Sequence, residues 1–165
     1  MKKIVICLAV VCAAIKINAQ ESNKTGIRVN TYAGLPVGYA SNHSDINLGI
    51  SIGYLGPIND IIKVGGHIGY DYSNVRNDSR LNNKSTFNYL MIGGSAEIDV
   101  YKNLYFGADL GYAFGQGKKT SGTHYFTPKL GYHYNELMDF YLHYKGVRFN
   151  GYQVASVGAG VAFKF

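Results

Sequence analysis

The sequence contains no tryptophan, three prolines and only two cysteines in 165 residues. Both cysteines, Cys7 and Cys12, lie in an N-terminal segment that has the layout of a secretory signal peptide. The rest of the chain therefore has no thiol for a disulfide framework, for a nucleophile or for a cysteine-ligated zinc site. Disorder and a collagen-like array are also excluded, because aromatic and branched apolar residues are plentiful and the 21 glycines follow no three-residue period.

The N-terminal apolar run is too short to cross a membrane as a helix. Ile4 to Ile15 holds twelve apolar residues, whereas a spanning helix needs roughly 17 to 25. Two lysines precede this run, and Ala19 supplies a small residue at a cleavage position. The sequence thus predicts a signal peptide at residues 1–19 and one mature domain at residues 20–165.

The basic excess of the chain is small once this segment is set aside. Residues 1–19 contain three of the 16 basic residues and no acidic one, so the formal net charge falls from +6 to +3. A nucleic-acid partner requires a dense basic face. The sequence therefore argues against nucleic-acid binding.

The mature chain consists of short segments in which apolar residues alternate with small or polar ones, the period of a β-strand. From position 104 to 114, for example, the even positions are apolar, whereas the odd ones include Gly107, Asp109 and Gly111. The sequence predicts eight strands, at Gly26–Leu35, Ile46–Tyr54, Ile62–Tyr72, Thr86–Ile98, Leu104–Phe114, Thr123–Tyr134, Asp139–Phe149 and Val154–Phe165.

Long polar connectors between these segments alternate with tight ones, and only the short connector around Asn150 breaks the pattern. This alternation indicates an up-and-down order with the longer loops on one side. Closing the sheet removes two edges of unpaired backbone groups. Strands of about 10 to 12 residues also suit a tilted crossing of a bilayer. The predicted fold class is all-β, an eight-stranded antiparallel up-and-down transmembrane β-barrel.

Volume decides which face of the sheet points outward. An eight-stranded barrel has just enough interior for its own side chains, so a face rich in Leu, Ile, Phe and Tyr is predicted to face lipid. Recurring Gly-Tyr pairs place Tyr54, Tyr70, Tyr112 and Tyr132 on that outer face, where they are predicted to form an aromatic girdle at the membrane interface.

The inner face carries charged residues. The sequence predicts an interior polar network of Arg28, Lys63, Glu97, Asp109, Lys129 and Lys164. Buried charges persist when they are paired, so one interpretation is a set of salt bridges that closes the lumen. The alternative is a narrow, gated ion path, for which eight strands leave little room.

The final segment carries a family resemblance. Val154 to Phe165 alternates and ends on an aromatic residue, and it is similar to the last strand of bacterial outer-membrane barrels. The chain resembles small OmpA/OmpX-type barrels and the barrel proteins of Bacteroidetes. This resemblance implies a Gram-negative outer membrane, contact with its lipids and lipopolysaccharide, and recognition of Phe165 by the barrel assembly machinery as an assembly signal. It implies no cofactor.

Two other functions stay open. One is a lipid A modifying outer-membrane enzyme. His43, Asp78 and Ser79 fall in predicted outer loops, an arrangement similar to that of a lipid A palmitoyltransferase, although Gln20 to Thr25 is too short for the helix that precedes the first strand in that family. A secreted lipocalin-like carrier is the other alternative. The sequence favours a non-enzymatic outer-membrane barrel with a structural or surface-interaction role, at most a narrow pore, with no predicted catalytic, cofactor or metal site and no identified external ligand.

Overall fold

The computed structural model describes residues 26–38, 41, 44–75, 87–115, 122–149 and 152–165. They form eight strands, β1 (Gly26–Val37), β2 (Ser44–Pro57), β3 (Ile62–Val75), β4 (Phe87–Tyr101), β5 (Leu104–Gly115), β6 (Thr123–His133), β7 (Met138–Phe149) and β8 (Tyr152–Lys164). Among these residues, no helix is long and apolar enough to cross a membrane. The predicted signal peptide lies outside the described residues.

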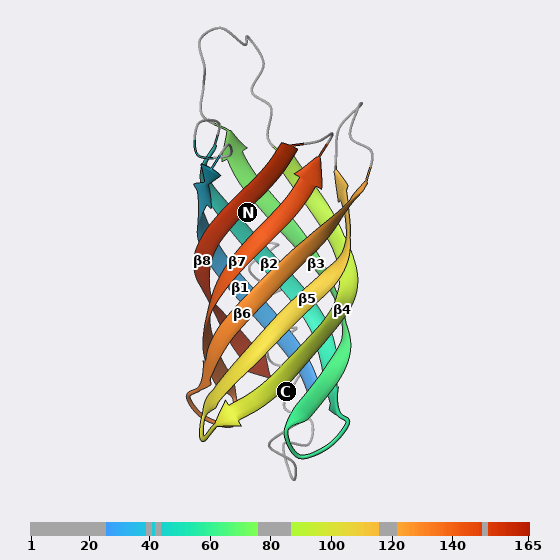
Figure 1. The fold of residues 1–165 in the computed structure, drawn as a ribbon, viewed down its shortest axis with the longest axis vertical. Coiled ribbons are helices and arrows are strands. Elements are labelled where there is room, and N and C mark those ends of the chain that lie inside the picture. Colours follow the sequence, from blue (N-terminus) through green and yellow to red (C-terminus); the bar gives the residue numbers. More distant parts are fainter. Residues whose placement is uncertain (1–25, 39–40, 42–43, 76–86, 116–121, 150–151) are drawn as a thin grey trace, which may run out of the picture.

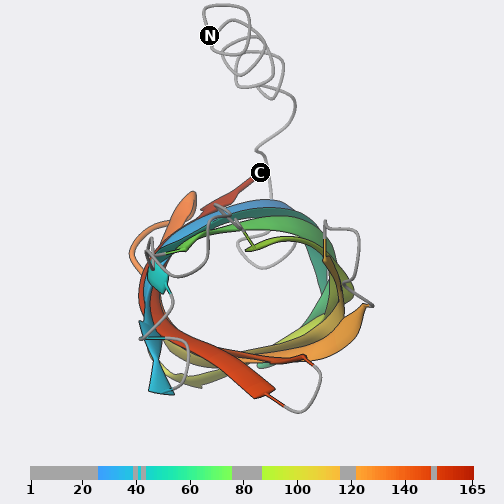
Figure 2. The same ribbon diagram turned by 90° about the horizontal axis from the view of Figure 1, so that it is seen from above.

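The eight strands form one closed barrel in chain order, and β1 completes it by pairing with β8. Every neighbouring pair is antiparallel. The strands tilt steeply around the wall in the side view (Figure 1) and enclose a single lumen in the end view (Figure 2). The predicted eight-stranded up-and-down barrel is therefore confirmed, and the closed sheet leaves no edge strand.

The connectors separate the two ends of the barrel. Three short ones, at residues 58–61, 102–103 and 134–137, lie at the end where Phe165 follows β8, which we call the turn end. Asn59 Oδ1 accepts hydrogen bonds from two backbone N–H groups there, which stabilises the first of these turns. At the opposite end, which we call the loop end, lie the last residues of β1, β3, β5 and β7 and the first residues of β2, β4, β6 and β8.

Most strands are longer than predicted, and the difference that matters for the lumen is at the end of β4. The prediction ended the fourth strand at Ile98 and began a turn at Asp99, whereas β4 continues to Tyr101 and the turn is only Lys102 and Asn103. The register shifts between Asp99 and Tyr101, as at a β-bulge, so pairing with β5 resumes beyond the irregular residue.

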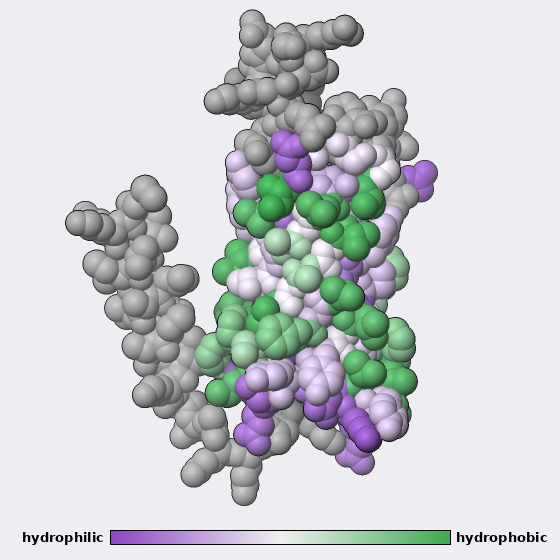
Figure 3. All heavy atoms as spheres, turned by 90° about the vertical axis from the view of Figure 1, so that its left-hand side faces the viewer, coloured by the Kyte–Doolittle hydropathy of each residue, from purple (hydrophilic) through white to green (hydrophobic). Residues whose placement is uncertain are grey.

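The two faces of the wall divide as the volume argument predicts. In β2, Leu48, Ile50 and Ile52 are exposed on the outside, whereas Asn47 and Ser51 are buried. The space-filling view shows hydrophobic side chains over much of the wall and hydrophilic ones toward its ends (Figure 3). This distribution matches a barrel with a lipid-facing exterior and a polar interior.

The assumption that large side chains would crowd the lumen is wrong for tyrosine. Tyr32, Tyr89, Tyr105, Tyr125 and Tyr141 all line the interior together with the charges. Three of these rings cover a glycine on the next strand so closely that a Cβ there would overlap the ring, in the pairs Tyr32–Gly49, Tyr105–Gly131 and Tyr141–Gly160. Glycine thus provides the space that each inward tyrosine occupies.

Candidate functional site

The lumen at the turn end contains a buried cluster of paired charges. Arg28 Nη1 lies 2.8 Å from both carboxylate oxygens of Glu97, across the barrel from β1 to β4. The same nitrogen lies 3.5 Å from Asp139 of β7. Lys164 of β8 donates to Asp139 at 2.7 Å. These contacts connect β1, β4, β7 and β8 inside the lumen.

His133, the last residue of β6, connects this cluster to the Asp99–Lys63 ion pair between β4 and β3. Its Nδ1 lies 2.9 Å from Asp139, and its Nε2 lies 3.1 Å from Asp99. The Asp99 carboxylate also pairs with Lys63 at 3.0 Å. The ring of Tyr105 stacks on the imidazole with 4.6 Å between centroids. Three basic residues of the predicted interior network, Arg28, Lys63 and Lys164, thus lie at this end with acidic partners.

The predicted polar network omitted three members of this cluster, Asp99, His133 and Asp139. Asp99 was assigned to a turn, and the other two lie at strand ends, where alternation has few residues to support it. Extending the period of two from Glu97 to position 99, and from Tyr141 back to position 139, places both aspartates on the inner face.

A second charged layer lies in the middle of the lumen. Lys129 Nζ lies 2.6 Å from Asp109. These two members of the predicted network lie on adjacent strands, where Asp109 pairs in register with Thr127, so Lys129 is its diagonal neighbour. Its long side chain reaches the carboxylate across that diagonal.

A chain of hydrogen bonds continues from Asp109 to β3 and β6. Ser95 Oγ donates to Asp109 at 2.8 Å, and its oxygen lies 2.8 Å from His67 Nδ1. Since the single hydroxyl proton of Ser95 is used, His67 Nδ1 is the donor in the second contact. Its Nε2 then accepts from the Tyr125 hydroxyl, 2.5 Å away. Every polar atom in this chain has a structural partner.

The other ion pair of the middle layer joins β3 to β7. Lys145 Nζ lies 2.5 Å from Asp71, and both groups contact the hydroxyl of Tyr32, which donates to the carboxylate. Between this pair and Lys129 the interior retains a cavity of about 20 Å³. That volume is close to what one water molecule requires.

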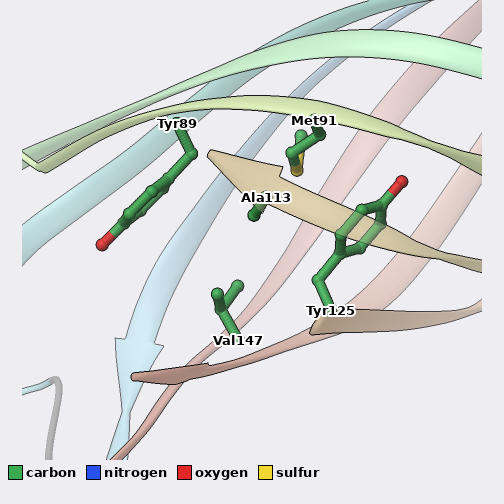
Figure 4. Packing of buried hydrophobic residues seen from close by; sticks show 5 residues of the cluster. All are labelled: Tyr89, Met91, Ala113, Tyr125 and Val147. Atoms are coloured by element: carbon green, nitrogen blue, oxygen red, sulfur yellow. The ribbon is translucent and has the colours of Figure 1, made fainter. Parts of the chain in front are cut away.

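Toward the loop end, the lumen contains a buried hydrophobic cluster of Tyr89, Met91, Ala113, Tyr125 and Val147, which come from β4, β5, β6 and β7 (Figure 4). Asn47 and Ser73 are also buried toward this end, where the Asn47 amide donates to the Ser73 hydroxyl at 2.9 Å. The described part of the barrel is therefore filled by two layers of paired charges and by this mainly apolar layer.

The four predicted interface tyrosines do not occupy equivalent positions. Tyr54 and Tyr132 are exposed near the turn end. Tyr70 and Tyr112 are half-buried, and position 70 lies nearer the middle of a strand that runs from 62 to 75. The turn end carries additional exposed aromatic residues that the prediction omitted, namely Tyr101, Phe106, Tyr134, Phe140 and Phe163. The observed aromatic belt is therefore concentrated at that end.

Phe165 is exposed at the turn end, and its backbone N–H donates to the carbonyl oxygen of Ile27 at 2.9 Å. The last residue is thus tied to β1, at the junction that closes the barrel. The candidate enzymatic residues His43, Asp78 and Ser79 lie outside the described residues. Among the residues that the structure does describe, no group of three or more His, Cys, Asp or Glu could hold a metal ion.

The sequence matches no protein-family model and no curated protein. The structure is similar to that of Ail, the attachment invasion locus protein of Yersinia pestis, with a TM-score of 0.61, 13% identity and coverage of 86% of this chain and 99% of that chain. It is also similar to the N-terminal β-barrel domain of Pseudomonas aeruginosa OprF, with a TM-score of 0.57, 14% identity and coverage of 86% and 100%.

Neisserial surface protein A is a third similar structure, with a TM-score of 0.53, 18% identity and coverage of 87% of this chain and 98% of that chain. Identities this low show a common fold. The fold is that of small outer-membrane barrels, as the sequence resemblance implied.

Proposed function

We propose that this chain is an exported, non-enzymatic outer-membrane barrel with a sealed lumen, and that its role is structural or in surface interaction. One observation carries the proposal: the lysine, arginine, aspartate and glutamate side chains that face the described lumen form ion pairs inside the wall, while the exterior is apolar. A protein surrounded by water is expected to have the reverse arrangement. The similarity in fold to outer-membrane barrels supports the same location.

This arrangement also argues against a lipocalin-like carrier. A carrier of apolar ligands requires an apolar cavity open to one end. Here the middle of the lumen holds the ion pairs Asp71–Lys145 and Asp109–Lys129, and Lys145, Asp109 and Lys129 line a cavity of about 20 Å³. That cavity is far below the roughly 300 Å³ of even a small ligand site.

The membrane location predicts heat-dependent migration in gels. A barrel closed by hydrogen bonds on every strand should remain folded in detergent at room temperature and unfold on boiling. We therefore expect the protein in the outer-membrane fraction, with different mobilities in unboiled and boiled samples. Recovery in the soluble fraction with one mobility would contradict the proposal.

The sealed lumen predicts the absence of a stable conductance. Ions would have to pass two layers of paired side chains and the apolar layer of Tyr89, Met91 and Val147. In planar bilayers that contain the refolded protein, we expect no discrete current steps, with an open porin as the positive control. Reproducible single-channel steps from the wild-type barrel would show that the lumen is a pore.

We propose in addition that Phe165 is the signal read by the barrel assembly machinery, and that the outer surface contacts outer-membrane lipids and lipopolysaccharide. Phe165 is exposed and lies where β8 meets β1. Its exposed side chain at that junction is accessible to an assembly factor.

A further inference from the structure

The outer wall carries two basic side chains at the loop end, His124 at the start of β6 and Arg148 near the end of β7. Both are exposed. His124 lies on the same face as the exposed Phe126, and Arg148 on the same face as the exposed Leu142, because side chains alternate along a strand. They therefore point away from the lumen, at the upper limit of the apolar wall.

The structure holds these two residues next to each other. Tyr125 pairs with Val147, and the same antiparallel register brings position 124 beside position 148. The Thr123 hydroxyl donates to the carbonyl oxygen of Arg148. The ring of Tyr112, in register with His124, meets the imidazole edge to face at 5.3 Å between centroids.

Both ends of the wall carry exposed aromatic residues, Tyr54 and Tyr101 at the turn end and Phe114 and Phe126 at the loop end. At the loop end, the guanidinium of Arg148 has no carboxylate partner among the described residues. An outward arginine costs about 2 to 4 kcal/mol at the centre of a bilayer and about 0 to 1 near its interface. Arg148 is thus expected at the level of the lipid headgroups.

We propose that Arg148 and His124 bind a phosphate group of lipid A in the outer leaflet. This inference rests on the outer-membrane location proposed above. The guanidinium offers two parallel N–H donors that match two phosphate oxygens, and the imidazole offers a further N–H donor beside it. Phe126 next to the pair, and Leu142 further along β7 toward the turn end, provide apolar surface for the acyl chains of the same lipid.

The test uses the refolded full barrel in phosphatidylcholine vesicles with increasing amounts of lipid A. The measured quantities are the lipid A bound per barrel, by mass spectrometry, and the lipid A fraction that gives half of the maximal rise in unfolding temperature. For Arg148→Gln we expect roughly a five- to tenfold higher lipid A requirement, the effect of losing one cation near an anionic surface. Arg148→Lys should fall between this variant and the wild type, because it keeps the charge and loses the paired donors.

Lys102→Gln is the matched control, since Lys102 is an exposed cation at the turn end, 5.2 Å from the ring centroid of Tyr101. It should bind lipid A like the wild type. Vesicles with dephosphorylated lipid A or phosphatidylglycerol, and free inorganic phosphate, identify the ligand. The proposal predicts weak responses to all three.

Equal lipid A requirements for the wild type and Arg148→Gln would overturn the site. An equal response to phosphatidylglycerol would overturn the assignment to lipid A, and an equal response to inorganic phosphate would overturn the assignment to a lipid. Should Arg148→Gln fail to refold, His124→Gln provides the same comparison at the neighbouring donor. Failure of the wild type itself to fold into any vesicle would instead contradict the outer-membrane proposal.

Discussion

Replacing Glu97 by alanine is expected to lower the free energy of unfolding by about 3 to 5 kcal/mol, the usual cost of removing one partner of a buried ion pair. Arg28 would keep its position in the lumen, where only 4% of its surface is exposed. Its remaining acidic contact is Asp139 at 3.5 Å, which Lys164 and His133 already share. The positive charge of the guanidinium would therefore be only partly compensated by Asp139.

Urea unfolding of the barrel in lipid vesicles measures this effect. Glu136→Ala is the matched control, because Glu136 is an exposed carboxylate in the turn between β6 and β7 and its removal should change stability by less than about 0.5 kcal/mol. The double variant Arg28→Met and Glu97→Met removes both charges and should recover much of the loss. A Glu97→Ala barrel as stable as the control would show that the pair is not buried as described.

The sequence contained most of what determines the wall. Alternation from 104 to 114 predicted both the extent of β5 and its outward face, because a period of two in apolar residues is a local property. Alternation also placed Arg28, Lys63 and Glu97 on the inner face. It did not show that Arg28 meets Glu97, since that contact crosses the lumen from β1 to β4 and exists only after the barrel has closed.

The interior was harder to predict because its packing depends on register. Tyr105 has the inner parity in the sequence, but its ring fits the lumen only because the register places Gly131 opposite it. Asp99 also has the inner parity, but it meets Lys63 only because the register of β3 and β4 places Lys63 beside Glu97, two residues away. Neither fact can be read from the residues adjacent to it in the chain. For the same reason, the sequence predicted the type of residue inside the lumen better than its contacts.

The Tyr105–Gly131 contact leads to the second large effect, which we expect from Gly131→Val. A Cβ at position 131 would lie within the ring of Tyr105, and that ring is 1% exposed and stacked on His133. Inserting a methyl group into a packed interior usually costs about 1 to 3 kcal/mol. Valine adds three carbon atoms where even the first has no space, so we expect a loss above that range or no folded barrel.

Gly94→Val is the matched control, because Gly94 is an exposed glycine of β4 whose added Cβ would meet only the carbonyl oxygen of Gly65, at 3.6 Å. Valine favours strands, so this variant should be as stable as the wild type or more stable. The heat-dependent gel shift and urea unfolding detect the difference between the two variants.

Tyr105→Ala, combined with Gly131→Val, separates crowding from other effects of valine. Tyr105→Ala alone should destabilise the barrel, because it removes a buried ring. If the valine is harmful only because the ring occupies its space, adding it to Tyr105→Ala should cost much less than adding it to the wild type, a coupling that a double-mutant cycle measures. Equal costs in both backgrounds would mean that Gly131 is required by the backbone and not by the tyrosine. A large coupling would show that Tyr105 fits the lumen because a glycine lies opposite it. Each pairing of an inward tyrosine with a glycine on the next strand, together with the ion pairs, would then specify the register of the strands.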